Sequence, residues 1–455
     1  MMDFSTFISP GRKGYLVGIG GVSMSSLAEV LRGMGLTIVG SDMNEGPNVE
    51  SLRRKGIEVY IGHRAEHIAP DVDFLVRTAA VHDDNPEIAF ARAQGIPVFE
   101  RTQAWGAISR DYRHALCIAG THGKTTTTSM CTHIQMVAGR DPTVMIGGTL
   151  PLLHAGHRVG EGDTIVMEAC EYYNSFLSLF PTVAVILNVE ADHLDFFKDL
   201  ADVQRSFRAF AARVPADGWV VVNRDDPSAM ETVSGLDRQI MTFGLTSEAD
   251  VYPENLRFLG ANASFDIVCR GERFTDVKLQ VPGLHNVKNA LAAAAASICL
   301  GIGGTAVKYG LGAFSGAGRR FEFKGKFNGA DVFDDYAHHP SELKALLDAV
   351  EKLQYQRTVL VFQPHTFSRT AALFDDFIAQ LRRPDVLVLA EIFAAREKDT
   401  IGISSRSLAE HIPGSIFLPS FGEIEQELRR IVRPGDVVLT VGAGDVYRIG
   451  ESLVE

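Results

Sequence analysis

Short runs of apolar, largely β-branched residues alternate with longer stretches of helical pattern along most of the chain. Polar residues do not alternate with apolar ones inside these runs, which is typical of strands buried on both faces of a parallel sheet. We therefore predict an α/β fold in which helices connect the strands. The predicted strands cover residues 15–17, 37–41, 74–76, 96–99, 116–119, 164–167, 183–187, 219–222, 359–362, 386–389 and 437–440.

A strand followed by a glycine-rich loop and a helix begins near residue 15 and again near residue 116. A chain of 455 residues is long enough for about three domains. We predict domains over residues 1–109, 110–318 and 319–455, the second ending at the glycine-rich segment 315–318. Residues 240–282 carry short strand patterns and are predicted to form an antiparallel insert.

The charge balance narrows the range of partners. The chain has 44 Lys+Arg against 56 Asp+Glu, a formal net charge of −12. Such an acidic protein is a poor binder of nucleic acid and of anionic membrane surfaces, so we expect neither as a partner. Phosphate ligands stay compatible with this charge, because a helix N-terminus and one or two cations can hold them locally.

Five scattered cysteines indicate a reducing compartment. Their number is odd and none belongs to a Cys-x-x-Cys pair, which argues against a disulfide framework and against a cysteine zinc site. The first residues lack the basic start and apolar run of a signal peptide, and no stretch reaches the roughly 20 apolar residues of a membrane span. We expect a cytoplasmic protein.

The first glycine loop, Gly18–Ser25, follows a predicted strand and opens a predicted helix. Its bare backbone N–H groups at a helix N-terminus suit a diphosphate. Asp42 ends the next strand about 20 residues later, where dinucleotide folds place a ribose-binding carboxylate. Ser23 stands near the position of the third glycine of that fingerprint. The loop alone therefore leaves open an NAD-dependent dehydrogenase, another diphosphate ligand and a structural turn.

The second glycine loop, Gly120–Thr126, has the residue types of a nucleoside-triphosphate site. It follows an apolar strand and precedes a threonine-rich helix, and it is shorter than the common G-x4-G-K-(S/T) spacing. Its amides can cradle the β- and γ-phosphates, Lys124 can bridge them, and the Thr125 hydroxyl can bind Mg²⁺. The loop predicts an ATP site and disfavours the dehydrogenase. A P-loop switch or binding module is the non-enzyme alternative.

Polar residues after two predicted strands supply candidate metal ligands. The first group is Glu168 and Glu171, and the second is Asn188, Glu190, Asp192 and His193. The carboxyl ends of parallel strands meet at one edge of a sheet, and Mg²⁺ prefers oxygen ligands. Together with Thr125, these residues are therefore candidate ligands of Mg²⁺ or Mn²⁺, among them Glu168 and His193. Asp192 or Asp195 would fix the tautomer of His193. Asp192 taken alone is better explained as a helix N-cap, and the presence of such residues after two strands is what favours the metal site.

The order and spacing of these motifs resemble the Mur ligase family over essentially the whole chain. The matching segments are residues 120–125, 168–171, 188–195, 283–290, 319–322 and 334–340. Residues 18–25, 85–87 and 362–370 look like the family member that joins L-alanine to UDP-N-acetylmuramate. A murein-recycling ligase, which joins a tripeptide to the same sugar nucleotide, is the alternative within the family.

The resemblance implies a three-domain Mur ligase architecture. A Rossmann-like first domain would bind UDP, a P-loop ATPase-like central domain would bind ATP and Mg²⁺, and a Rossmann-like third domain would bring the amino acid. ATP would phosphorylate the lactyl carboxylate of UDP-N-acetylmuramate, and the amine of L-alanine would attack the acyl phosphate to form an amide. Such a ligase would act in peptidoglycan precursor synthesis, as a monomer or a homodimer.

The resemblance also implies roles for individual residues. The UDP sugar would contact Gly18, Gly20, Gly21, Ser23, Met24, Ser25, Asp42, His63, Thr78, Ala79 and His122. ATP would contact Gly120, Thr121, His122, Gly123, Lys124, Thr125, Thr126, His285, Asn286, Asn289, Arg320 and Asp335. L-Alanine would contact Tyr336, His338, His365 and Arg369, and the catalytic residues would be Lys124, Glu168, His193 and Arg320. From the residues alone, the polar group at 285–289 is better explained as the cap and polar face of an alanine-rich helix.

The sequence departs from the family pattern at two positions. Cys170 stands where many relatives have Asp, and we expect a packed side chain there because Mg²⁺ prefers oxygen. Thr366 stands where many relatives have Arg, so part of the contact with the carboxylate of alanine would come from elsewhere, with Arg396 as a candidate. Residues 203–208 contain no lysine, so we expect no carbamylated lysine.

Overall fold

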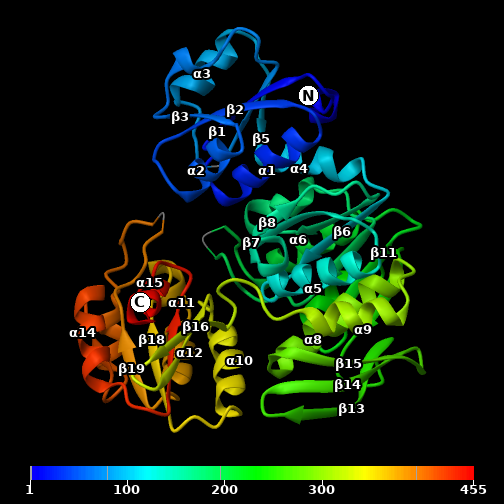
Figure 1. Ribbon diagram of the computed structural model, residues 1–455. Coiled ribbons are helices and arrows are strands. Elements are labelled where there is room, and N and C mark those ends of the chain that lie inside the picture. The colour runs from blue at the N-terminus through cyan, green and yellow to red at the C-terminus, as the bar shows by residue number, and fades with distance from the viewer. Residues whose placement is uncertain (1–2, 79, 195, 396, 455) are drawn as a thin grey trace. The chain divides into compact units, whose positions relative to one another are not determined.

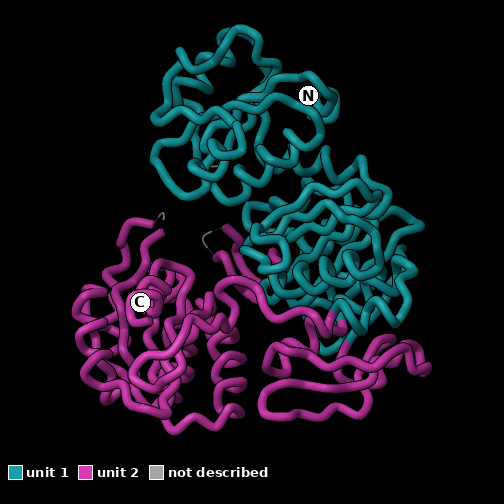
Figure 2. Tube along the Cα trace, viewed as in Figure 1, with its two compact units in different colours: residues 1–189, 204–243, 292–310 teal, residues 190–203, 244–291, 311–455 magenta. Residues whose placement is uncertain are grey.

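The computed structural model describes residues 3–78, 80–194, 196–395 and 397–454. Three residues named above for the site, Ala79, Asp195 and Arg396, lie outside the described residues. Strands and helices alternate along the chain (Figure 1), which confirms the predicted α/β class. The chain forms two compact units (Figure 2): residues 1–189, 204–243 and 292–310 in the first, and residues 190–203, 244–291 and 311–455 in the second.

The first unit begins with a parallel sheet in the order β3-β2-β1-β4-β5. Its strands are β1 (Lys13–Val17), β2 (Thr37–Asp42), β3 (Glu58–Ile61), β4 (Phe74–Arg77) and β5 (Val98–Glu100). Its helices are α1 (Val22–Gly33), α2 (Pro47–Arg54), α3 (Pro86–Ala93) and α4 (Arg101–Arg110). Strand β1 pairs with β2 on one side and β4 on the other, so the loops after β1 and β4 flank the switch point where α/β sheets bind ligands.

A second sheet of the first unit runs in the order β12-β11-β10-β6-β9-β7-β8. Its strands are β6 (His114–Ala119), β7 (Thr143–Leu150), β8 (Ala155–Arg158), β9 (Thr164–Glu168), β10 (Val183–Ile186), β11 (Trp219–Asn223) and β12 (Gln239–Phe243). Neighbours are parallel except β7 and β8, which pair antiparallel. Strand β6 lies between β9 and β10, so the segments after these three strands meet at one edge.

Helix α5 (Lys124–Val137) follows β6 and the 3-10 helix η4 (Tyr172–Ser178) follows β9. The remaining helices of this part of the chain are α6 (Leu200–Ala211), α7 (Pro227–Val233), α8 (Leu284–Cys299) and α9 (Gly304–Ala313). Each of the helices α5 and α7 connects two strands, as the sequence pattern predicts for an α/β sheet.

In the second unit, β13 (Val251–Leu259), β14 (Asn262–Cys269) and β15 (Glu272–Pro282) form an antiparallel meander. The antiparallel insert predicted for residues 240–282 is right for these three strands. It is wrong for the start of that range, because β12 pairs parallel with β11. The physical reason is that α7 connects β11 to β12, and a helical crossover brings two strands into parallel order.

The second unit also holds a sheet in the order β16-β17-β21-β18-β19-β20. Its strands are β16 (Glu322–Phe327), β17 (Ala330–Asp335), β18 (Arg357–Phe362), β19 (Val386–Leu389), β20 (Ile416–Phe417) and β21 (Asp436–Val441). Only β16 and β17 pair antiparallel among these described strands. The helices are α10 (Pro340–Glu351), α11 (Phe367–Ala372), α12 (Phe374–Leu381), α13 (Ser405–Glu410), α14 (Phe421–Ile431) and α15 (Tyr447–Val454).

Buried side chains cover both faces of this last sheet. Leu360 and Phe362 of β18 belong to one buried cluster, whereas Val359 and Val361 belong to another. Successive residues of a strand point to opposite faces, which explains why the run 359–362 is apolar throughout.

Strands β1–β5, β6–β15 and β16–β21 fall within the three predicted domain ranges, while the boundary residues themselves stay a prediction. Within the described ranges, no helix has the length and apolar character needed to cross a membrane.

Candidate active site

The P-loop joins β6 to α5 and is held by a residue from the end of β10. Gly120 and Gly123 have φ angles of 150° and 80°, which favour glycine. The Asn188 side chain accepts a hydrogen bond from the backbone N–H of His122 at 2.8 Å and donates one to its carbonyl at 3.1 Å. The backbone N–H of Thr121 donates to the Asn188 carbonyl at 3.2 Å. Asn188, predicted only as part of a polar group, therefore fixes the shape of the loop.

Lys124 begins α5 and lies among acceptors. Its Nζ donates to the carbonyls of Gly120 at 2.5 Å and Thr121 at 3.1 Å, and lies 3.0 Å from Glu171 Oε2. Burial by itself lowers the pKa of Lys124, but the nearby negative charges, with Glu171 the strongest and Glu168 contributing, together raise the pKa above its usual value. The side chain is therefore a cation at the mouth of the loop. Glu171, predicted near the metal, is the partner of this lysine.

Thr125 and Glu168 are brought together as the metal prediction requires. The Thr125 hydroxyl donates to Glu168 Oε2 at 2.9 Å, and the backbone N–H of Gly147 donates to the same oxygen at 2.8 Å. A hydroxyl beside a carboxylate is a set of hard oxygen donors that suits Mg²⁺. His193, the third predicted ligand, belongs to the second compact unit.

Cys170 lies between Glu168 and Glu171 and is exposed. The expectation that it would be a packed side chain is wrong. The reason is that β9 ends at Glu168, so Cys170 lies in the segment where the chain leaves the sheet.

The first glycine loop meets Asp42 and Thr78 at the switch point of the first sheet. The backbone N–H of Gly20 donates to Asp42 Oδ2 at 2.8 Å. Added Cβ atoms would lie 2.7 Å from Thr78 Cγ2 at Gly18 and 2.9 Å from Asp42 Oδ2 at Gly20, so neither position has room for a side chain. Gly21 is the N-cap of α1 and has no side chain to satisfy the first N–H groups of the helix. This arrangement suits an anion at the helix start.

The remaining predicted contacts of the UDP sugar are divided between the core and the sheet edge. Ser23, Met24 and Ser25 form the first turn of α1, where Met24 is buried and the Ser25 hydroxyl donates to the carbonyl of Val22. His63 follows β3 and contacts Ser41 and Glu87, a buried carboxylate that belongs to the 85–87 segment and for which the sequence predicts no role in the site.

The predicted alanine contacts lie close together in the second unit. The ring of His338 lies 5.4 Å from Tyr336 and 5.6 Å from His365 between centroids. Arg369 Nη1 lies 3.1 Å from His365 Nδ1. Burial lowers the pKa of His338 to about 4 and, together with the charges of His338 and Arg369, lowers that of His365 to about 3. Both rings are therefore neutral at pH 7.

Arg369 already binds a carboxylate in this structure. Its Nε and Nη2 lie 3.1 and 2.9 Å from Asp192 Oδ1, and both side chains are less than a tenth exposed. The Asp192 carboxylate lies 3.9 Å from His193 Nε2, which is longer than a hydrogen bond, and it accepts from the His193 backbone N–H instead. Asp192 therefore does not fix the His193 tautomer as predicted.

Other predicted ATP contacts in the second unit support backbone structure. Asp335 is half-buried and accepts hydrogen bonds from the N–H groups of Phe321 and Ala337, and the loss of hydration raises its pKa to about 6. The guanidinium of Arg320 lies 5.1 Å from the Tyr336 ring centroid.

At the start of α8, His285 is exposed, whereas Asn286 and Asn289 are buried. The Asn286 amide donates to the carbonyl of Pro282 at 2.7 Å, and the Asn289 amide donates to Asn286 Oδ1 at 3.1 Å. Both residues lie inside α8, and neither contact satisfies a backbone N–H at the helix start, so these contacts do not support the capping interpretation.

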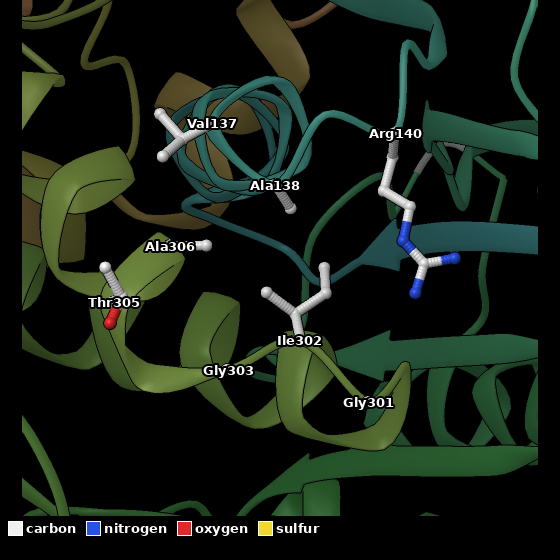
Figure 3. Close-up of a pocket in the computed structure, with 8 residues that line it drawn as sticks. All are labelled: Val137, Ala138, Arg140, Gly301, Ile302, Gly303, Thr305 and Ala306. Atoms are coloured by element: carbon white, nitrogen blue, oxygen red, sulfur yellow. The ribbon is translucent and has the colours of Figure 1, made fainter.

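A separate pocket of about 340 Å³ lies at the far end of α5. Figure 3 shows Arg140 extending towards the loop of residues 301–303, which precedes α9. Because α5 spans 14 residues, this end lies roughly 20 Å from the P-loop. The pocket therefore takes no part in the predicted ATP site.

Comparisons with known proteins cover the chain from end to end. The models for the Mur ligase family catalytic domain, the Mur ligase middle domain and the glutamate ligase domain match residues 14–113, 118–297 and 319–444. The UDP-N-acetylmuramate–L-alanine ligase of Agathobacter rectalis is 47% identical over 97% of both chains, and that of Clostridium novyi is 44% identical over 100% of both.

Solved structures give the same picture. UDP-N-acetylmuramate–alanine ligase MurC from Thermotoga maritima matches with a TM-score of 0.82 at 28% identity, over 97% of this chain and 98% of that one. A murein peptide ligase from Psychrobacter arcticus matches with a TM-score of 0.72 at 25% identity, over the same shares. The motifs, the fold and these full-length matches lead to one conclusion: the chain belongs to the Mur ligase family.

Proposed function

We propose that the protein uses ATP to join L-alanine to the lactyl carboxylate of UDP-N-acetylmuramate, in the synthesis of peptidoglycan precursors. The observation that carries this proposal is identity of 42–47% over nearly the full length of relatives with that activity in their names. The murein-recycling alternative has less support, because the murein peptide ligase structure matches with the lower TM-score.

The reaction has two steps. A carboxylate oxygen of the sugar nucleotide attacks the γ-phosphorus of ATP, the bond to the β-phosphate oxygen breaks, and an acyl phosphate and ADP result. The neutral amine of L-alanine then attacks the acyl carbon, phosphate leaves with the carbon–oxygen bond electrons, and the nitrogen loses a proton. The protein contributes position and charge neutralisation.

Lys124 is the proposed cation for the β- and γ-phosphates. Its ammonium group is hydrogen-bonded to two loop carbonyls and paired with Glu171. Phosphate oxygens would compete for the same ammonium protons, while the raised pKa keeps the charge in place. The Gly120–Thr126 loop presents its amides around this group, and Asn188 holds the loop in shape.

Thr125 and Glu168 are the proposed ligands of the Mg²⁺ that accompanies ATP, with His193 as a further ligand and Mn²⁺ as an alternative ion. The short contact between the Thr125 hydroxyl and the Glu168 carboxylate supports the first two. A divalent cation bound there would supply positive charge near the transferred phosphoryl group.

Arg369 is the proposed binder of the alanine carboxylate, beside the neutral rings of His338 and His365. Its guanidinium group contacts the Asp192 carboxylate, which supports a carboxylate as the kind of group that Arg369 binds. Thr366, which replaces an arginine common in relatives, is the N-cap of α11 and provides no cation.

The first sheet is the proposed binding site of UDP, with the diphosphate at the glycine loop before α1. We also place the reaction in the cytoplasm, in line with five free cysteines and no disulfide among the described residues.

Phosphate release from ATP tests the proposed function directly. We expect release to require both UDP-N-acetylmuramate and an amino acid, with L-alanine as the best one. Release without any amino acid would favour the P-loop switch, and a preference for a tripeptide would favour the recycling ligase.

A further inference from the structure

A buried carboxylate lies beneath the proposed sugar-nucleotide site. Glu87 is the second residue of α3, where the Asn85 side chain caps the helix and accepts from the Glu87 and Ile88 N–H groups. The Glu87 side chain is 0% exposed and points into the sheet edge rather than into solvent. A carboxylate in such a place needs hydrogen-bond donors, since an unpaired buried charge is strongly destabilising.

Five donors surround this carboxylate. Oε1 accepts from the Tyr15 hydroxyl at 2.8 Å, the Arg64 backbone N–H at 3.3 Å and His67 Nδ1 at 3.4 Å. Oε2 accepts from the Ser41 hydroxyl at 2.6 Å and His63 Nδ1 at 2.9 Å. Every one of these groups can donate to an ionised carboxylate, which is an acceptor only.

The hydrogen bond to Glu87 fixes the tautomer of His63. If Nδ1 carries the one ring proton, which Glu87 Oε2 accepts, Nε2 keeps its lone pair and is an acceptor. Among the described residues Nε2 makes no hydrogen bond, and the His63 side chain is 10% exposed. The ring therefore offers one oriented acceptor at the surface of the sheet edge.

His63 is connected to the glycine loop through the backbone. It follows Gly62, whose N–H donates to the carbonyl of Asp42 at 2.8 Å, while the Asp42 carboxylate accepts from the Gly20 N–H. Ser41, the second donor to Glu87 Oε2, precedes Asp42 on β2. Glu87 thus contacts residues on both sides of the Asp42–Gly62 hydrogen bond, at the carboxyl ends of β2 and β3.

We propose that Glu87 is a positioning residue for nucleobase recognition: it holds His63 with the proton on Nδ1, so that Nε2 accepts a hydrogen bond from the imide N–H of uracil. Cytosine carries an acceptor at that ring nitrogen, so the same tautomer disfavours it. The identity of the nucleotide in this inference rests on the proposed function, whereas the position of the proton on the His63 ring does not depend on it.

The test compares four proteins: the wild type, Glu87→Gln, His63→Ala and the double variant. Gln keeps the shape of the side chain but replaces one acceptor oxygen with a donor. We expect Glu87→Gln and His63→Ala each to raise KM for UDP-N-acetylmuramate about tenfold to a hundredfold, with kcat and KM for ATP within about twofold. The double variant should be no worse than His63→Ala, because Glu87 acts through that ring.

Tyr15→Phe is the matched control. It removes a donor from the same buried carboxylate, at the oxygen that does not contact His63. We expect a lower melting temperature and an unchanged KM for the sugar nucleotide. A rise in KM equal to that of Glu87→Gln would mean that general loss of packing, and not the His63 ring, produces the effect.

Two further readouts separate this inference from the proposed function. Nitrogen NMR of ¹⁵N-histidine protein should show the His63 proton on Nδ1 in the wild type, and this needs neither turnover nor ligand. Inhibition of ligation by UDP should exceed inhibition by CDP, and Glu87→Gln should narrow the difference. A proton on Nε2 in the wild type, or fully multiplicative effects in the double variant, would overturn the inference. A wild type that ligates nothing would overturn only the proposed function.

Discussion

At the scale of single residues, the ion pair of Lys124 and Glu171 predicts that the lysine contributes both to turnover and to stability, and that the two contributions can be measured separately. Lys124→Ala should lower turnover by about a hundredfold or more, because a cation at the transferred phosphoryl group is lost. It should also lower the melting temperature, since Glu171, 3% exposed, loses its charge partner.

The double variant Lys124→Ala/Glu171→Gln should regain part of the lost melting temperature and none of the activity. Lys344→Ala, which removes an exposed lysine paired with Asp348 on α10, is the control and should leave turnover within about twofold. Turnover of a tenth or more of the wild type in Lys124→Ala would contradict the assignment.

A second prediction at this scale concerns Glu168. Glu168→Gln should raise the Mg²⁺ concentration needed for half-maximal turnover about tenfold or more, because a neutral amide is a weaker ligand for a hard cation. Titration of activity with Mg²⁺ measures this. An unchanged Mg²⁺ dependence would remove Glu168 from the metal site.

The two neutral histidines predict a pH effect on stability. Burial, together with nearby positive charges, holds the pKa of His365 near 3, against about 6.5 in the unfolded chain. Between these values the unfolded chain binds the extra proton, so this residue lowers the free energy of unfolding as pH falls from about 6.5 towards 3.

Urea denaturation of the wild type and His365→Gln across this pH range should show the wild type losing more stability, on the order of 2 kcal/mol. Asp335, whose pKa is raised and whose effect has the opposite sign, is present in both proteins and cancels in the comparison. Parallel pH curves would show that His365 titrates normally.

At the scale of elements, β7 shows how closely a neighbouring strand approaches the proposed metal site. A Cβ atom at Gly147 would lie 2.8 Å from Glu168 Oε1. Gly147→Ala should therefore displace the carboxylate and raise the Mg²⁺ requirement without touching a ligand. Gly422→Ala on α14, where nothing lies within 4 Å, is the control and should change neither activity nor Mg²⁺ dependence.

The buried parallel strands could be predicted from the sequence because a short, continuous apolar run between turn residues is typical of a strand covered on both faces. Strands β1, β6, β10 and β18 all lie where such runs indicated them. The hairpin of β7 and β8 was not predicted, because glycines and half-exposed positions interrupt its apolar pattern. Strand pairing in β12 was mispredicted because composition does not reveal which neighbour a strand joins.

The residues of the candidate site likewise include some whose roles could be predicted from the sequence and some whose roles could not. Lys124 and Thr125 could be predicted because the P-loop is local in sequence. The roles of Asn188, Glu171 and Glu87 could not, since their contacts span 66, 47 and up to 72 residues of chain. Contacts over such distances depend on the packing of the whole sheet, which no local spacing records.

At the scale of the whole molecule, two hypotheses for the first glycine loop, a sugar-nucleotide site and a dinucleotide site, differ in the ligand that the first sheet should bind. UDP-N-acetylmuramate should raise the melting temperature in step with its saturation of the native state, and NAD and NADP should have little effect. Thermal shift assays at several ligand concentrations measure this. A clear shift with NAD and none with UDP sugars would restore the dehydrogenase hypothesis.

The hydrogen bonds between Asn188 and the P-loop have a consequence for amide hydrogen exchange and for the entropy of ATP binding. The amide hydrogens of Thr121 and His122 are both donated to Asn188, so they should exchange slowly with deuterium when the enzyme is measured without ATP. Little order is then left to create in that segment when ATP binds. Most of the unfavourable entropy of ATP binding should therefore arise outside the loop. In Asn188→Ala the loop should be less ordered before ATP binds, so that its ordering on binding adds to the unfavourable entropy.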